Sequence, residues 1–330
     1  MQAKMIRAPG RSLFRSDAVQ KLMAFAGLIA LFVVFSLASP NFLTLDNVIG
    51  ILLATAVNGV LALGATFVII AAGIDLSVGT VMTFSAVMTG VFVVFWGLPI
   101  PLGIVGGILA GGVCGLVNGL VISKMKVPPF IATLGMLYAT RGLSLVISGV
   151  KPIYFNDTPE FRQIAMGSAL GALIPGLDIP NAVFIMFGAA VVAGLILTKT
   201  VLGRYCFAIG SNEEATRLSG VNVDAWKAAV YMLCGMFAGL GGVIMASRLN
   251  SAQPALGAGY ELDAIAAVVI GGTSLRGGEG TILGTIIGAF IISVLANGLR
   301  ILSVPQEWQM VVTGAIVVLA VYADIIRRRQ

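Results

Sequence analysis

The chain has 330 residues, of which 58% are hydrophobic and 10% are charged, and its mean hydropathy is +1.02. A soluble domain carries roughly 25% charged residues. The composition therefore excludes a soluble globular protein and indicates an all-α polytopic membrane protein surrounded by lipid. The formal net charge of +6 does not indicate nucleic-acid binding, because in such a chain the basic residues mark the cytoplasmic side.

Hydropathy predicts about ten membrane spans. Segment 1–21, which contains several lysines and arginines, precedes the first span. The alternative to a first span is a cleaved signal peptide, because small residues end the apolar run at Ser36-Leu37-Ala38. The expected spans are Leu22–Ala38, Val48–Ala72, Val78–Phe95, Pro101–Ile122, Phe130–Ser148, Ala182–Leu197, Val230–Ser247, Leu262–Ser274, Ile282–Leu302 and Met310–Ala323. A full crossing needs roughly 20 residues, so we expect Leu262–Ser274 to be broken or re-entrant.

The predicted order is a cytoplasmic segment 1–21, a first transmembrane half 22–197, a cytoplasmic loop 198–229, a second half 230–323 and a cytoplasmic tail 324–330. This orientation places fifteen of the 20 lysines and arginines inside, in agreement with the positive-inside rule. Both termini are then cytoplasmic. The longest outer segment, Gly149–Asn181, is either a docking surface or an ordinary solvated loop.

The two halves resemble each other weakly. Three motifs recur in the same order: Gly73-Ile74-Asp75-Leu76 as Gly259-Tyr260-Glu261-Leu262, Asn118-Gly119-Leu120 as Asn297-Gly298-Leu299, and Val127-Pro128 as Val304-Pro305. Because five spans separate equivalent helices, the halves are predicted to be inverted, an arrangement common in transporters with a pathway between repeats. Chance similarity between glycine-rich helices is the alternative.

Loop 198–229 is the one long polar interval of the chain, with seven charged residues. Residues 211–220, SNEEATRLSG, predict a short capped helix: Ser211 or Asn212 accepts from the first-turn N–H groups, and Gly220 ends the last turn. Glu213 and Glu214 would lie at the positive end of its dipole. Such a helix has to leave the bilayer and meet either solvent or another protein.

Polar side chains inside the predicted spans are candidates for a solute pathway or gate, because a buried charge is costly unless it faces a cavity or a partner. The charged candidates are Asp75, Arg141, Glu261 and Asp263, and the neutral ones, which can hydrogen-bond a polyol, are Asn58, Asn118, Gln253, Tyr260 and Asn297. Asp75 and Asp263 are equally suited to cap helix starts. Any of the neutral residues can instead join helices.

The sequence contains no constellation for catalysis or metal binding. Histidine is absent, the three cysteines lack CxxC spacing, and the chain has no GxSxG, HExxH or Walker A motif. The glycine-rich segment Gly271–Gly280 lacks the Lys-Ser/Thr of a phosphate loop and is interpreted as a tight inner turn with close helix packing. We therefore expect a non-enzymatic chain without a metal or cofactor of its own.

Three segments resemble the ribose-type permeases of bacterial ABC sugar importers. They are AAGIDLSVGTVM at Ala71–Met82, GRYCFAIGSNEEATRLSGVNV at Gly203–Val223 and SAQPALGAGYELDAIAAVVIGGTSLRGGEGTILGT at Ser251–Thr285. The resemblance implies an ABC importer permease fold in the bacterial inner membrane. It also implies a homodimer that receives a monosaccharide, ribose or a related pentose or hexose, from a periplasmic sugar-binding protein. A cytoplasmic ABC ATPase partner would bind ATP and Mg²⁺.

In this family, loop 198–229 would couple the permease to the ATPase. Glu214-Ala215 followed by Gly220 looks like a reduced EAA…G signature of importer permeases; Thr216 replaces the second alanine, and the Ile-x-Leu-Pro that ends the fuller signature is absent. The expected coupling residues are Glu213, Glu214, Ala215, Arg217 and Gly220.

Two other functional classes are compatible with the residues alone. An ion- or proton-coupled secondary transporter of a small polar solute would use Asp75, Glu261 or Asp263 as the carrier group. Its uptake would collapse on addition of an uncoupler at constant ATP. A membrane enzyme is the third class. Copurification with a soluble Walker-type ATPase distinguishes the importer from both.

Overall fold

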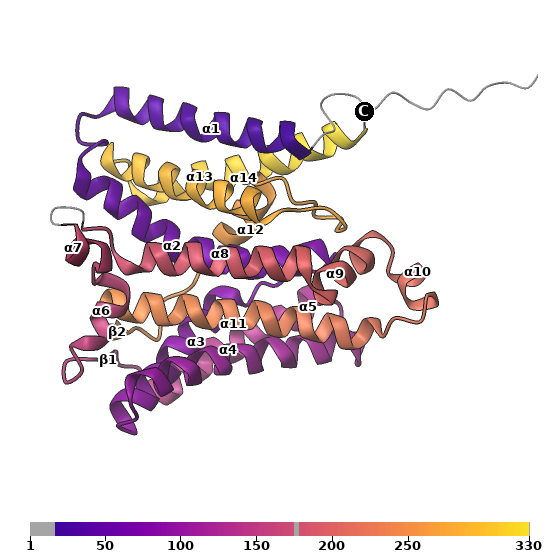
Figure 1. Ribbon diagram of the computed structural model, residues 1–330, viewed down its shortest axis with the longest axis horizontal. Helices are drawn as coiled ribbons and strands as arrows, with labels where there is room; N and C mark the ends of the chain where they lie inside the picture. The colour runs from indigo at the N-terminus through magenta and orange to yellow at the C-terminus, as the bar shows by residue number, and fades with distance from the viewer. Residues whose placement is uncertain (1–16, 175–177, 330) are drawn as a thin grey trace, which may run out of the picture.

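The computed structural model describes residues 17–174 and 178–329. Most of the long helices lie roughly along one axis (Figure 1), with α9 and α10 at one end, here named the α10 end, and the two strands at the other, named the β1 end. The elements are α1 (Asp17–Ala38), α2 (Leu45–Ile70), α3 (Val78–Gly90), η2 (Val91–Phe95, a π-helix), α4 (Ile100–Ser123), α5 (Pro129–Ser148), β1 (Ile153–Tyr154), α6 (Glu160–Met166), α7 (Ala169–Leu173), α8 (Asn181–Lys199), α9 (Val201–Ser211), α10 (Glu213–Leu218), α11 (Val223–Leu249), β2 (Ser251–Ala252), α12 (Tyr260–Ile270), α13 (Ile282–Ile301) and α14 (Gln306–Arg329).

Each of the ten predicted spans coincides with a helix. Among the described residues, seven helices are long and apolar enough to cross a membrane: α2, α3 continued by η2, α4, α5, α8, α11 and α13. The apolar part of α1, Leu22–Ala38, is shorter, and α12 has only 11 residues, as expected of a broken span. α14 continues to Arg329 instead of ending at Ala323, so most of the predicted tail 324–330 is helical. Of the predicted segment 1–21, residues 1–16 lie outside the described part of the chain.

In each half of the molecule, one long helix packs against helices of the other half. α2 contacts α12 and α13 of the second half, whereas α11 contacts α3 and α4 of the first. α2 ends at the α10 end, but α11 ends beside β2 at the β1 end, so equivalent helices run in opposite directions (Figure 1). The predicted inverted arrangement is confirmed.

The contact between α4 and α11 shows what many of the glycines do. A Cβ atom added at Gly115 would overlap the carbonyl oxygen of Tyr231, and one added at Gly235 would overlap that of Gly111. The two backbones touch without intervening side chains, which is the usual device for close helix packing in lipid. Other helices, among them α2 and α3, pack against this pair.

Each half contains one interruption of a span, 71–77 before α3 and 253–259 before α12. α2 ends because Ala72 adopts a left-handed φ of +57°. Its N–H bonds back to the Ile69 carbonyl (3.0 Å) and the Gly73 N–H to the Val68 carbonyl (2.9 Å), which together form a Schellman closure. In the second half, Gly259 with a φ of +94° turns the chain into α12.

The predicted outer segment Gly149–Asn181 contains ordered structure that hydropathy does not indicate. β1 pairs antiparallel with β2. α6 packs on α11, where the Ser247 hydroxyl donates to the Phe161 carbonyl (2.7 Å) and accepts from the Ala165 N–H (2.9 Å). A strand of two residues has no detectable periodicity, so it could not be predicted.

Candidate functional site

The starts of α3 and α12 meet inside the bundle. A Cβ atom added at Gly79 would lie 2.6 Å from Oε2 of Glu261, whose Oε1 accepts from the Gly259 N–H at 3.1 Å. Beside this contact, the Thr83 hydroxyl donates to the Leu256 carbonyl at 2.5 Å. The positive ends of two helix dipoles therefore point toward one region, and the Glu261 carboxylate lies where it offsets them.

Asp75 holds the interruption 71–77 in place. Its buried carboxylate accepts from the Ser77 N–H (2.8 Å) and the Ser77 hydroxyl (2.6 Å). The Asn118 amide of α4 donates to the same hydroxyl at 3.0 Å, and the Cys234 thiol contacts the carboxylate. Asp75 thus finds its hydrogen-bond partners inside the protein and fixes the start of α3. Asn118 joins α4 to this helix start.

A polar cavity of about 240 Å³ lies between α2, α12 and α13, toward the β1 end. The last turn of α11 adds one arginine to its wall. The lining residues are Gly50, Ala54, Val57, Asn58, Arg248, Tyr260, Asp263, Ile292, Ser293, Ala296, Asn297 and Arg300. Its volume is below the roughly 300–1,000 Å³ of sites for drug-sized ligands, and is suited to a smaller polar molecule.

Three polar atoms in the wall of this cavity have no hydrogen-bond partner in the protein. They are Oδ1 of Asn58, Oγ of Ser293 and Oδ1 of Asn297. Asn58 and Ser293 are only 7% and 4% exposed, so solvent at the surface does not satisfy them. Buried polar atoms normally find partners, and their concentration here indicates a site that a hydroxyl-rich solute or water fills.

The charges in the cavity are also unbalanced. Arg248 and Arg300 stand in the wall together with Asp263, and in the described part of the chain neither arginine lies within ion-pair distance of a carboxylate. The Asn58 side chain faces the Asp263 carboxylate. N–H donors of the two arginines and oxygen acceptors of Asp263 and the asparagines therefore surround one small space, so its wall can both donate to and accept from a solute hydroxyl group.

Four of the predicted pathway residues line this cavity: Asn58, Tyr260, Asp263 and Asn297. The other five lie elsewhere: Asp75 and Asn118 at the first interruption, Glu261 at the contact of α3 with α12, Gln253 beside β2, and Arg141 on the exposed face of α5. The alternative that Asp263 caps α12 is wrong, because Gly259 is the N-cap and the Asp263 N–H already bonds to the Gly259 carbonyl within the first turn.

Sequence reasoning missed Arg248, Arg300 and Ser293. A signal was present for two of them, because Ser293, Asn297 and Arg300 are spaced i, i+4, i+7 and so share one face of α13. Arg248 lacks such a signal. It lies in the last turn of α11, where a basic residue is ordinary.

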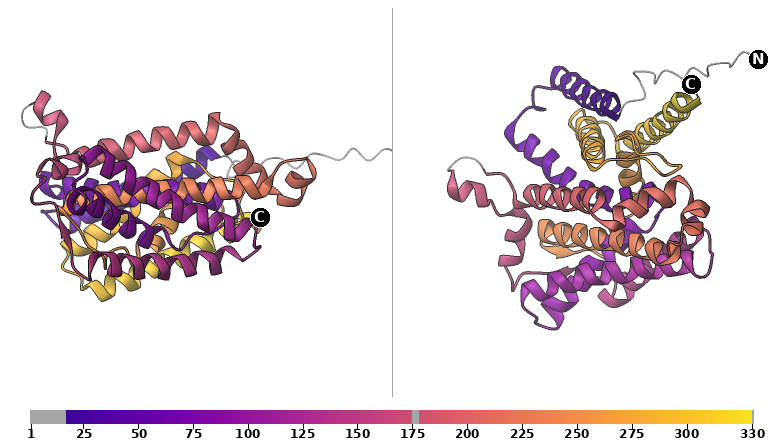
Figure 2. Two further views of the ribbon diagram at one scale, coloured as in Figure 1. Left: turned by 90° about the horizontal axis from the view of Figure 1, so that it is seen from below. Right: turned by 45° about the vertical axis from the view of Figure 1, so that its right-hand side comes forward.

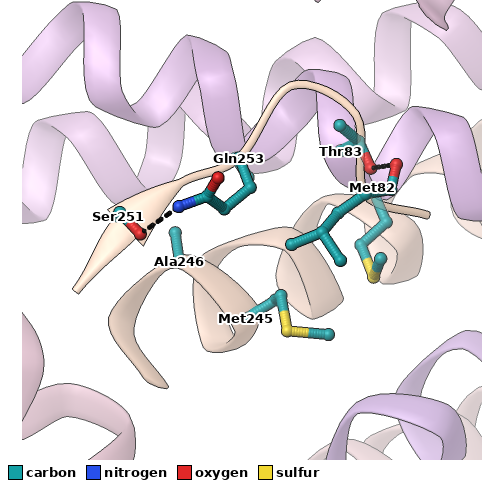
Figure 3. A pocket seen from close by; sticks show the side chains of 8 residues that line it. Met82, Thr83, Met245, Ala246, Ser251 and Gln253 are labelled. Carbon is teal, nitrogen blue, oxygen red and sulfur yellow. Dashed lines mark hydrogen bonds between the residues drawn. The ribbon is translucent and has the colours of Figure 1, made fainter. Parts of the chain in front are cut away.

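Gln253 lies in a second, much smaller pocket of about 10 Å³ (Figure 3). Its amide donates to the Ser251 hydroxyl at 2.9 Å, while Met82, Thr83 and Met245 fill the opposite walls. The space is about the size of one water molecule. Gln253 therefore fastens the second interruption to β2 and does not face a solute-sized space.

α10 projects beyond the other helices at its end of the bundle (Figures 1 and 2). The predicted capped helix is confirmed, since Oδ1 of Asn212 accepts from the Ala215 N–H at 2.9 Å and Gly220 follows the helix with a φ of +84°. The predicted coupling residues are all exposed. Beside them, the Leu218 side chain, which sequence reasoning did not single out, is 82% exposed.

Ion pairs fasten α10 to α11, and α11 to the turn before α5. Lys227 contacts Glu213 at 2.6 Å, and Asp224 is shared by Arg217 and Lys126, both at 2.9 Å. The hydrogen bond from Arg217, followed by that from Lys126, lowers the pKa of Asp224 to about 2. Partial burial raises the pKa of Glu213, but Lys227 and Arg217 outweigh this effect and the net pKa lies below its ordinary value.

The chain matches a family model described as the branched-chain amino acid transport system permease component, over residues 47–321. It is 41% identical to the ribose import permease protein RbsC of Escherichia coli strain K12, covering 96% of this chain and 97% of that protein. The RbsC protein of Bacillus subtilis strain 168 is also 41% identical, with 98% of both chains covered. The xylose transport system permease protein XylH of Escherichia coli strain K12 is 34% identical, with 97% and 95% covered.

No solved structure matches the chain. The family match covers most of the sequence, and the relatives correspond almost from end to end. The fold agrees, being an all-α multi-pass bundle. The chain belongs to this permease family and, within it, to the ribose-type permeases of ABC sugar importers.

Proposed function

We propose that this permease moves a monosaccharide, ribose or a related pentose or hexose, inward across the inner membrane. A periplasmic sugar-binding protein delivers the sugar, and a separate cytoplasmic ABC ATPase binds ATP and Mg²⁺ and supplies the work. The sugar permeases among the relatives support the solute class. The observation that carries the proposal to this chain is the small cavity with three unpartnered polar atoms.

The α10 end faces the cytoplasm in this proposal. Helix α1 begins at the α10 end, and helix α14 ends there (Figure 1). Both positions agree with the proposal that the two termini are cytoplasmic. Four further basic residues lie near the ends of helices at the α10 end: Lys124, Lys126, Lys199 and Arg204. The excess of basic residues supports this orientation. The cavity, near the β1 end, is then accessible from the periplasmic side.

The sugar enters the cavity by exchanging hydrogen bonds with water for bonds with the wall. Asn58, Ser293 and Asn297 accept from its hydroxyl groups, Asp263 accepts as a carboxylate, and Arg248 and Arg300 donate to its oxygens. The sugar then passes the contact between α3 and α12 when the two halves tilt. A pathway between inverted repeats is the arrangement found in many transporters.

A second copy of the chain completes the membrane unit. Arg141 lies on the exposed face of α5, between the exposed side chains of Tyr138 and Val146. A guanidinium group facing lipid costs roughly 2.5–3.5 kcal/mol on insertion scales. A homodimer that covers this face of α5, or that encloses a water-filled space beside it, removes this cost.

α10 is the surface that seats on the ATPase. Glu213 and Arg217 are held by their ion pairs, which present Glu214, Ala215 and Leu218 outward in a fixed orientation. Gly220 has no neighbouring atoms that a side chain would meet, so its role is to allow the left-handed backbone that ends the helix. Leu218 supplies the apolar centre of the contact.

The proposal is tested by reconstituting the permease with its ATPase in proteoliposomes and adding ribose-loaded binding protein outside. Uptake of labelled ribose is expected to require ATP inside and to continue when an uncoupler is present. Uptake that collapses with the uncoupler at constant ATP, or a permease that never copurifies with an ATPase, contradicts it. Ribose, xylose and a hexose tested in parallel establish the sugar.

A further inference from the structure

Three segments that are distant in sequence meet at the α10 end: the end of α2, the end of α9 and the glycine-rich segment 271–280 that follows α12. We call this meeting point the α2–α9 junction. The Gly278 N–H donates to the Ile70 carbonyl at 2.8 Å. The Schellman closure of α2 satisfies the carbonyls of Val68 and Ile69 but not that of Ile70, so the loop supplies the missing donor.

α9 packs against the two residues that form this hydrogen bond, Ile70 and Gly278. A Cβ atom added at Gly210 would overlap the Ile70 carbonyl oxygen and would lie 2.5 Å from the Gly278 nitrogen. One turn earlier, the Cys206 thiol donates to the Phe67 carbonyl at 2.9 Å. The backbone of α9 therefore lies directly on the end of α2, with no side chain between them.

The loop closes on the junction from the other side. At Gly277, with a φ of +83°, an added Cβ would lie 2.7 Å from the Cβ of Ala72 and 2.9 Å from the Gly210 carbonyl oxygen. At Gly278, with a φ of +76°, it would lie 3.1 Å from the Cα of Ser211. Both the positive φ values and the lack of space require glycine. The glycine-rich motif is thus a fitted contact for α9.

The α2–α9 junction lies next in the chain to α10 and to both interrupted spans. Only Asn212 separates α9 from α10, Ala72 belongs to the interruption that leads into α3, and the loop follows α12 without a gap. The junction therefore connects the exposed helix α10 to both interrupted spans. Backbone contacts without flexible side chains transmit displacement with little loss, because packed interiors are stiff.

We propose that the α2–α9 junction moves as one rigid body and carries the displacement of α10 to the contact between α3 and α12, with Gly210 and Gly278 as its positioning residues. This inference rests on the proposed seating of α10 on the ATPase. Binding of ATP moves α10, and the junction shifts the end of α2 and the end of α12 together. The two interrupted spans then separate at the contact between Gly79 and Glu261.

The first test replaces Gly210 with alanine in the assembled transporter. Gly210 is helical, so alanine favours the helix itself, and only the contact with Ile70 and Gly278 is disturbed. The matched control is Gly188→Ala on α8, where an added Cβ meets nothing within 4 Å. In Gly210→Ala, uptake and stimulation of the ATPase by loaded binding protein are expected to fall roughly tenfold or more. Copurification with the ATPase and basal hydrolysis are expected to stay unchanged.

A second test changes the loop side of the junction. Gly278→Ala places a Cβ 3.1 Å from the Cα of Ser211 at a residue with a φ of +76°, so the loop has to move away from α9. The matched control is Gly97→Ala, where φ is also positive, at +63°, but an added Cβ meets nothing within 4 Å. Gly278→Ala is expected to lower uptake and ATPase stimulation as Gly210→Ala does, whereas Gly97→Ala has a comparable backbone strain that does not touch the junction. A Gly278→Ala protein that behaves like Gly97→Ala, or a Gly210→Ala protein that behaves like Gly188→Ala, overturns the inference.

The same series separates this inference from the proposed function. If Leu218→Asp, on α10 itself, leaves ATPase stimulation unchanged, the proposed coupling surface fails, and the junction inference fails with it. If Leu218→Asp abolishes stimulation while Gly210→Ala does not, coupling through α10 stands and only the junction inference is wrong.

Discussion

The carboxylate of Glu261, in the first turn of α12, lies against Gly79, in the first turn of α3. Two helices that run in opposite directions therefore begin at the same place, and a carboxylate from one offsets the dipole of the other. The contact joins the two inverted halves where each span is interrupted. Because nothing larger than glycine fits at position 79, the fit is specific to one relative placement of the halves.

We expect Gly79→Ala to lower both stability and transport. The added methyl would lie 2.6 Å from Glu261 Oε2 and overlap the Gly257 carbonyl oxygen, so the two helix starts have to separate. Overpacking of this kind costs about 1–3 kcal/mol. Thermal unfolding in detergent measures the loss. Gly194→Ala on α8, where an added Cβ meets nothing within 4 Å, is the control and should unfold at the parental temperature.

Ser293→Ala tests the cavity. Removing the hydroxyl takes one hydrogen bond from a bound sugar, and a typical net value of about 0.5–1.5 kcal/mol corresponds to roughly a two- to tenfold lower uptake rate at saturating binding protein. Ser85→Ala is a closely matched control, because its Oγ is also buried and unpartnered but lies outside the cavity. Equal effects of the two substitutions would remove Ser293 from the pathway.

The ion pairs of Asp224 give α10 a predictable dependence on pH. The pKa of Asp224 is lowered in the folded protein, so the pairs with Arg217 and Lys126 contribute above its ordinary value of 3.8 and are lost as the pH falls through about 2. Trp226, whose ring lies 5.0 Å from that of Tyr205, reports the contact of α9 with α11.

With Trp96 and Trp308 replaced by phenylalanine, the fluorescence of Trp226 should be constant at neutral pH and change only within this acidic window. Asp224→Asn lacks the titrating carboxylate, so the same change should be absent from its titration. A transition that persists in Asp224→Asn would assign the acid effect to another group. High salt should weaken the pairs at neutral pH, because these side chains are partly exposed to solvent.

Leu218→Asp should uncouple the ATPase while leaving the bundle intact. The side chain is exposed and makes no core contact, so a charge there has little effect on folding, but it disfavours burial against a partner. ATPase stimulation by sugar-loaded binding protein measures coupling. Leu302→Asp, at another exposed leucine beyond the end of α13, is the control and should retain full stimulation.

Hydropathy identified the helices well because lipid leaves a chain few alternatives to a helix. The shortness of α12 and the cap at Asn212 were also readable, since both depend on local sequence. α9 was not predicted, because glycines and Arg204 interrupt its apolar residues. Its register is set by Gly210 against Ile70, a contact between residues distant in sequence.

Only part of the candidate site could be predicted from the sequence, because it too depends on contacts between residues distant in sequence. Residue type correctly marked Asn58 and Asp263 as unusual in a membrane helix, and both line the cavity. Type could not separate them from Asp75 and Asn118, which are equally polar but find partners inside the protein. Which buried polar group has a partner is a property of the folded chain, and it decides which of them remain available to a solute.

The two arginines of the cavity, Arg248 and Arg300, have a consequence for the membrane potential. A water-filled space that opens during each transport cycle endangers the proton gradient, because protons and sodium ions are small enough to follow a sugar. Unpaired guanidinium groups set up an electrostatic barrier to such ions, and a chain without histidine lacks the commonest near-neutral proton relay. A neutral solute does not meet this electrostatic barrier, so in the proposed pathway the arginines that donate to the sugar would also oppose the leakage of protons.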